Sequence, residues 1–121
     1  MHNLPYLNPK EFGFSKENLG YKAPDGSYED KLFIYSPTIT LGTVLGKFTD
    51  EVCDIVFQTW DANMRQLFIA NGGRPIAHIV DYTHLPIPTP YMKTVGKEYF
   101  DRWFNEGIMS HQAIIGAPGP Y

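Results

Sequence analysis

Apolar and polar residues recur along this chain with two different periods, and the first period is that of strands. Residues 32–35 form a short apolar run rich in strand formers. Residues 39–45 alternate apolar with small or polar side chains, which is typical of a half-buried strand. Ser36-Pro37 separates the two runs, because proline cannot donate to a central ladder. The pattern predicts two consecutive strands.

After Gly46 the apolar residues recur every three or four positions, which indicates a helix. Thr49 is a good N-cap, and Asp50 and Glu51 place negative charge where the helix dipole favours it. Asn71-Gly72-Gly73 is a stop signal. We therefore expect a helix from about residue 50 to residue 70. Its predicted core stripe is Val52, Ile55, Val56, Trp60, Met64 and Leu67.

The remaining chain repeats this order of strand and helix. Residues 75–81 are almost continuously apolar, as in a buried central strand. Thr89-Pro90 looks like an N-cap followed by proline at the first helical position, and the second helix should end at 105–107. A last strand is expected at 112–116. Strands that alternate with helices predict an α/β domain with a single mixed, mostly parallel sheet and helices packed on it.

Residues 1–30 differ from the rest because they hold three prolines and three glycines and have no sustained period. They also carry several large apolar side chains, which argues against a free tail. We expect an N-terminal arm over residues 1–30 that packs on the domain, or on a second subunit. The α/β domain itself is expected over residues 31–121.

Composition and charge exclude several classes of protein. The net charge is −3 and the ten basic residues are scattered, so the basic face of a nucleic-acid-binding protein is missing. A single cysteine, Cys53, fits a reducing compartment. The first residues lack the pattern of a secretory signal, and no apolar stretch approaches the length of a membrane span. The expected location is the cytoplasm.

Short motifs at the ends of the expected elements resemble those of the STAS superfamily, which includes the anti-sigma-factor antagonists. They are Gly46 through Glu51 before the first helix, Gly72-Gly73-Arg74-Pro75 after it, and Ile79 through Leu85 around the strand that ends in Asp81. The resemblance covers roughly residues 31 to 116. It implies a STAS-like fold and a non-catalytic regulatory role through protein contacts.

The sequence departs from that family where the antagonists carry a phosphorylatable serine in an Asp-Ser-x-Gly context. The corresponding stretch here is Pro88-Thr89-Pro90-Tyr91, with no Asp before the hydroxyl residue and no Gly after it. Thr89 is therefore interpreted first as a helix N-cap and only second as a phosphorylation site. The resemblance supports the fold more than the phosphorylation switch.

Residues at the carboxyl end of the 75–81 strand are the best site candidates by position. Ligands of open α/β sheets bind at such ends, which points to Asp81, Tyr82, Thr83 and His84. The alternative, which we favour, is that Asp81 caps the loop and Tyr82 belongs to the core. A third hypothesis is an enzyme that uses His84 and Asp81 as an acid–base pair.

Metal and nucleophile chemistry have little support in the sequence. His78, Asp81 and His84, with His111, are possible ligands. However, His78 and Asp81 fall on opposite faces of a strand, so no metal and no cofactor is expected. Cys53 in a helix is more often a small buried hydrophobe than a nucleophile. We predict a protein that is not an enzyme.

The second helix carries more aromatic surface than one buried stripe needs, namely Tyr99, Phe100, Trp103 and Phe104. This surface could meet a protein partner or a second copy of the chain, and a homodimer is the expected assembly. It could equally line a pocket for an apolar or aromatic small molecule between the second helix and the sheet, with Tyr82, Tyr99 and Trp103 as its walls. The sequence leaves both hypotheses open.

Overall fold

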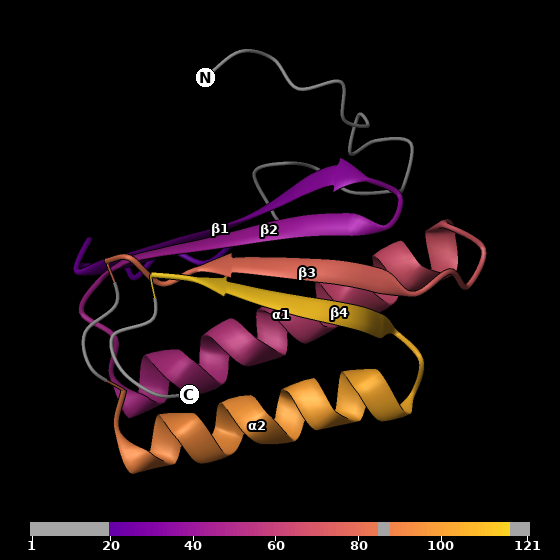
Figure 1. Cartoon of the computed structure of the whole chain (residues 1–121). Coiled ribbons are helices and arrows are strands. Elements are labelled where there is room, and N and C mark those ends of the chain that lie inside the picture. Colours follow the sequence, from indigo (N-terminus) through magenta and orange to yellow (C-terminus); the bar gives the residue numbers. More distant parts are fainter. Residues whose placement is uncertain (1–19, 85–87, 117–121) are drawn as a thin grey trace.

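The computed structural model of the chain describes residues 20–84 and 88–116, which form one sheet and two helices (Figure 1). The elements alternate after the first strand, as the sequence pattern predicts, and the α/β class is confirmed. In chain order they are β1 (Tyr28–Ser36), β2 (Ile39–Gly46), α1 (Asp50–Ala70), β3 (Ile76–Asp81), α2 (Pro90–Asn105) and β4 (Met109–Ile115).

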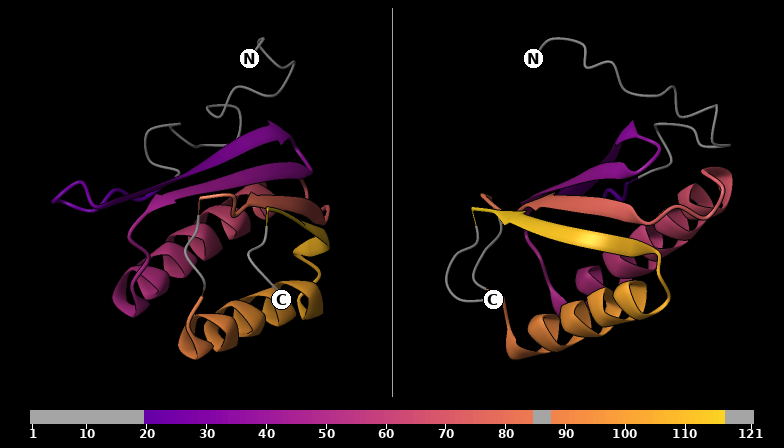
Figure 2. Two further views of the ribbon diagram at one scale, coloured as in Figure 1. Left: turned by 60° about the vertical axis from the view of Figure 1, so that its left-hand side comes forward. Right: turned by 45° about the vertical axis from the view of Figure 1, so that its right-hand side comes forward.

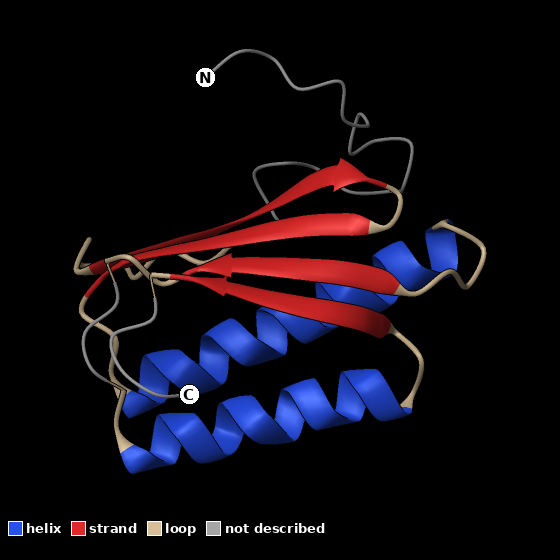
Figure 3. Cartoon of the chain, in the orientation of Figure 1, coloured by secondary structure: helices blue, strands red, loops and turns tan. Residues whose placement is uncertain are grey.

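The described sheet is mixed, and its strands lie in the order β1-β2-β3-β4. β1 pairs antiparallel with β2, whereas β2, β3 and β4 run parallel. Each parallel step needs a crossover, and α1 and α2 supply the two crossovers. Both helices cover the same face of the sheet (Figures 2 and 3). The core therefore lies between this face and the helices.

α1 begins and ends where the capping residues predict. The Thr49 hydroxyl accepts a hydrogen bond from the Val52 amide at 3.2 Å, and Asn71 closes the other end. The predicted core stripe is wrong at Ile55, which is 38% exposed. Cys53 and Phe57 occupy the core instead, because the buried face of α1 lies slightly around the helix from the one that the spacing suggests.

α2 is fixed to α1 at both of its ends. At the start, the Thr89 hydroxyl accepts from the Met92 amide at 3.2 Å and donates to Asp50 at 2.9 Å. At the end, Arg65 of α1 makes a two-pronged ion pair with Glu106, at 2.7 and 3.0 Å. These contacts set the position of α2 beneath the parallel strands.

Trp60 is the centre of the packed core. A Cβ on Gly42 would lie 2.6 Å from the Trp60 ring, so glycine on β2 lets the indole lie directly against the sheet. The indole nitrogen donates to the buried Asp30 carboxylate at 2.9 Å. The Asp30 carboxylate also accepts from the Tyr21 amide at 3.2 Å, which ties the residues before β1 to the core.

Two strands begin earlier than the sequence pattern predicts. β1 starts at Tyr28, so residues 28–30 belong to the sheet, and β4 starts at Met109. Lys22 bridges to Glu29 beside β1. Residues 1–19, where most of the predicted N-terminal arm falls, lie outside the described residues.

Candidate functional site

A pocket of about 440 Å³ lies between α2 and the sheet. Its walls come from five parts of the chain: the segment before α1, α1 itself, the end of β3 with the entry to α2, α2, and β4. The lining residues are Phe48, Phe57, Tyr82, Pro88, Met92, Lys93, Gly96, Lys97, Phe100, Asp101, Phe104, Gln112 and Ile114. Most of these side chains are apolar.

The aromatic walls of the pocket are held by ring contacts with the core. Phe57 stacks on Tyr99 with a centroid distance of 5.2 Å and meets Phe100 edge-on at 5.8 Å. Phe100 in turn packs against Trp103 at 5.5 Å. Such contacts keep the rings in fixed positions, so this part of the wall is formed in advance of any ligand.

One polar group is buried in the wall without a partner. The side-chain amide nitrogen of Gln112 is inaccessible to solvent and has no hydrogen-bond partner in the described part of the chain. A buried amide donor left in this state costs about 1–3 kcal/mol. The Gln112 side chain also lines the pocket, and a turn of this side chain would bring the amide nitrogen to a ligand oxygen.

Charged residues stand at the rim of the pocket. Lys97 pairs with Asp101 one turn along α2, at 2.5 Å. Lys93 takes part in none of the ion pairs found among the described residues, and its ammonium group is available to an acidic ligand. The pocket thus combines a large apolar wall, one amide donor and one cation.

The predicted site residues after β3 do not form a constellation for catalysis. Asp81 accepts hydrogen bonds from the amide and the hydroxyl of Thr83, at 2.9 and 2.5 Å, which makes a tight local turn. These bonds, the hydroxyl first, hold the pKa of the Asp81 carboxyl below its ordinary value. Thr83 and His84 are exposed, and Tyr82 is buried and lines the pocket.

The structure separates the predicted aromatic residues into two groups. Phe100 and Phe104 line the pocket. Tyr99 and Trp103 do not, which corrects the expected wall, because both turn toward α1. Tyr99 stacks on Phe57, and the Trp103 indole donates to Asp61 of α1 at 2.7 Å. Thr89 caps α2, as the sequence reading that we favoured predicts.

His78 and Cys53 are core residues. His78 is fully buried, its Nδ1 lies 2.8 Å from the Thr40 hydroxyl, and burial lowers its pKa to about 4. Burial raises the pKa of the Cys53 thiol to about 12, so the thiolate is strongly disfavoured. In residues 20–84 and 88–116, no three His, Cys, Asp or Glu side chains are grouped as a metal site requires.

Sequence reasoning missed several pocket residues, above all Phe48, Phe57, Lys93, Gly96 and Gln112. A signal for Gln112 exists. A register shift near Ser110 places Met109, Gln112 and Ile114 opposite the buried Ile76, His78 and Val80 of β3, so Gln112 is a polar residue between two apolar ones on the covered face. The signal is readable only when the strand is known to begin at Met109, and the sequence pattern places the start of this strand three residues later.

No family model, curated protein or solved structure matches this chain. Among the described residues, neither helix has the length and apolar character that crossing a membrane requires.

Proposed function

We propose that this protein binds a small organic molecule in the pocket between α2 and the sheet. The observation that carries the proposal is the pocket itself: about 440 Å³, walled mainly by aromatic and aliphatic side chains, with one unpartnered amide donor inside. Ligand sites in proteins commonly have volumes of about 300–1,000 Å³, apolar walls and a few placed polar groups.

The polar groups indicate the kind of ligand. The Gln112 amide donates to an acceptor oxygen, and Lys93 attracts negative charge at the rim. An apolar ring or chain that ends in an acidic group satisfies both. Phe104, which is 43% exposed, provides apolar surface at the open side of the pocket.

This proposal develops the sequence-based hypothesis of an apolar or aromatic ligand. The other hypothesis, a STAS-like regulatory domain that acts through protein contacts, stays a second candidate. The observation that favours it is the outer edge of β4, along which no described strand pairs. For catalysis we find no support in the Asp81–His84 segment, since the Asp81 carboxylate is engaged with Thr83.

A pair of fluorescent probes tests the proposal. Anilinonaphthalene sulfonate has an aromatic body and one acidic group, and N-phenylnaphthylamine has the same body without the acid. We expect saturable binding of one sulfonate probe per chain, with weaker binding of the neutral probe. Lys93→Gln should remove most of the difference between the two probes.

A matched pair of surface variants locates the binding. Phe104→Ser removes an exposed ring from the pocket wall and should weaken the sulfonate probe by about tenfold, the equivalent of 1.4 kcal/mol. Ile69→Ser removes a more exposed apolar side chain at the far end of α1, where the exposed fraction is 76%, and should change nothing. Equal effects of the two variants, or no saturable binding, would refute the proposal.

A further inference from the structure

The two edges of the described sheet differ in how they are protected. β1 carries the charged residues Glu29 and Lys31, and Lys22 bridges to Glu29 beside it. β4 has no Asp, Glu, Lys, Arg or Pro from Met109 to Ile115. Natural proteins place such residues on exposed edge strands to prevent pairing with other chains. An edge without them is suited to pairing.

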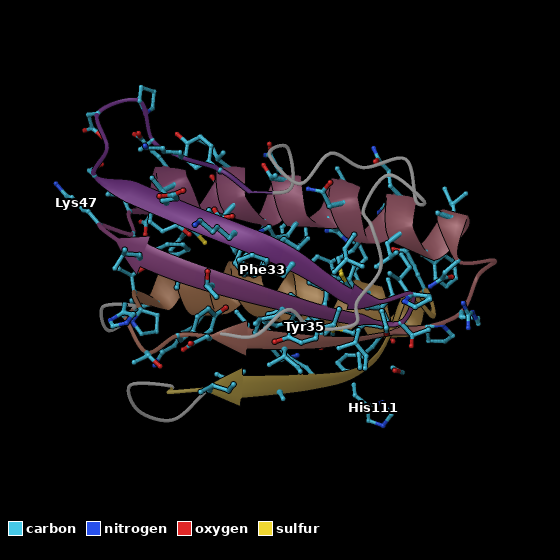
Figure 4. The ribbon with its side chains drawn as sticks, turned by 90° about the horizontal axis from the view of Figure 1, so that it is seen from above. Phe33, Tyr35, Lys47 and His111 are labelled. Carbon is cyan, nitrogen blue, oxygen red and sulfur yellow. The ribbon has the colours of Figure 1, made fainter. Side chains whose placement is uncertain are left out.

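Among residues 20–84 and 88–116, no strand pairs with the outer side of β4. The Tyr82 amide donates to the Ile115 carbonyl at 2.8 Å, so that carbonyl points toward β3. Backbone groups alternate in direction along a strand, so the amide and carbonyl groups of Gln112 and Ile114 point away from the sheet. In Figure 4, β4 borders the sheet on the side of His111, and no described element lies beyond it.

We infer that β4 pairs with β4 of a second copy of this chain, antiparallel and about a twofold axis at Ala113. In this register Gln112 lies opposite Ile114 of the second copy, and each pair exchanges the outward amide and carbonyl groups. The two sheets become one continuous sheet of eight described strands, twice the four in one chain. The isologous contact closes on itself, as in most soluble homodimers.

Charge and apolar surface favour a second copy over a foreign strand. α2 lies beside β4 and carries Lys93 and Lys97 at the pocket rim in its first half and Asp101 in its second half. The twofold axis sets the two α2 helices antiparallel, so Lys93 and Lys97 in the first half of one lie toward the second half of the other, which carries Glu98 and Asp101 together with Arg102. Ile115 and Phe104 are 50% and 43% exposed in one chain, and the second copy would cover part of this apolar surface.

Ala113 provides a test that leaves the pocket intact. Its side chain is exposed and lies on the face opposite Gln112 and Ile114, and in the proposed register it lies opposite Ala113 of the second copy. Side chains at such a pair have Cβ atoms about 4.5–5.5 Å apart, so two like charges repel. Ala113→Lys and Ala113→Glu should each be monomeric.

The decisive measurement is the mass in solution of the full chain, by light scattering after gel filtration. We expect the wild type at twice the 13.8 kDa of one chain, each variant at the mass of one chain, and an equal mixture of the two variants as a dimer again. A monomeric wild type overturns the inference. So does a dimeric Ala113→Lys variant, or a mixture that stays monomeric.

Hydrogen exchange gives an independent check should either variant fold poorly. In the wild-type dimer the outward amides of Gln112 and Ile114 are hydrogen-bonded, so their exchange should slow as protein concentration rises. Exchange of these two amides that does not depend on concentration would contradict the inference. Neither readout depends on a ligand, so the dimer and the pocket can fail separately.

Discussion

The face of the sheet that the helices cover has two halves, one filled and one hollow. Under β1, β2 and β3, Trp60 and Trp103 are at most 1% exposed and fill the space beside the strands. Some buried polar atoms there have partners, whereas Asp30 Oδ2, His78 Nε2 and the Tyr28 hydroxyl have none among the described residues. Asp30 accepts from Trp60, and His78 pairs with Thr40. This half stabilises the fold.

Beside β4 the same layer opens into the pocket. Phe104 stays 43% exposed, and the Gln112 amide nitrogen is buried without a partner among the described residues. Tight packing against the strands contributes stability, whereas an open wall with a partly exposed ring contributes less. The difference suggests that stability depends on the first half and recognition on the second, and substitutions can test this division.

The largest expected effect is in the filled half. Trp60→Ala removes the central ring and leaves a cavity, which should lower the free energy of unfolding by about 3–5 kcal/mol. Phe104→Ala on the pocket wall should cost less than about 1 kcal/mol, because the ring is already partly solvated. Urea unfolding of both variants measures the contrast. Similar losses in the two variants would contradict the division of the core.

The second effect depends on pH and comes from Asp30. Burial raises the pKa of this carboxyl from its ordinary 3.8 to about 6. The folded state therefore holds a proton that the unfolded state releases, and this contribution to stability is lost as pH rises from about 4 to about 6. Asp30→Asn keeps an oxygen acceptor for Trp60 without the ionisation. It should be more stable than the wild type by about 3 kcal/mol at neutral pH and about equal to it near pH 4.

His78 has the opposite dependence on pH. Burial lowers its pKa from 6.5 to about 4, so the unfolded state binds the proton and stability falls as pH drops through this range. In the wild type, between about pH 4 and pH 6, rising pH lowers the contribution of Asp30 to stability and raises that of His78, so the two trends oppose each other. In Asp30→Asn only the His78 slope remains, so the variant should lose stability steadily in acid. Urea midpoints across this range measure both trends.

The exposed Asp25 provides the control for this experiment. Hydrogen bonds from Ser27, the hydroxyl first, lower the pKa of its carboxyl, so Asp25→Asn should change the pH dependence in the opposite sense and weakly. A stability difference between Asp30→Asn and the wild type that stays constant with pH would show that Asp30 does not titrate as proposed.

Local signals in the sequence were sufficient for most of the fold. Thr49 and Thr89 are followed by helices that begin where capping predicts, and Gly72-Gly73 follows the end of α1. The start of β1 was missed because Tyr28 and Asp30 are part of a mixed stretch with no clear period. Asp30 is polar yet buried. Its partner Trp60 is 30 positions away in the sequence, so the local pattern does not show this pairing.

The sequence offers this pocket as one of two alternatives and in the right place, but of its three predicted wall residues only Tyr82 lines it. An aromatic excess on α2 indicated a pocket or a patch, and Phe100 and Phe104 do line the pocket. The sequence also places Tyr99 and Trp103 in this wall, because the spacing along one helix does not show which of its rings turn toward a neighbouring helix. Their partners Phe57 and Asp61 are on α1. Only the packing of the two helices shows that Tyr99 and Trp103 contact these residues.

The smallest expected effect separates stability from recognition at one residue. Gln112→Leu keeps the side-chain length near that of Gln and removes the orphan amide, so the free energy of unfolding should rise by about 1 kcal/mol. The same change removes the proposed donor to the ligand, so the sulfonate probe should bind more weakly. If Gln112 served only in packing, the substitution would lower both the free energy of unfolding and the probe affinity. If Gln112 had no role, neither quantity would change. Thermal unfolding and probe titration of this variant measure the two changes. Higher stability together with weaker probe binding is expected only if the hollow half of the core is a binding site.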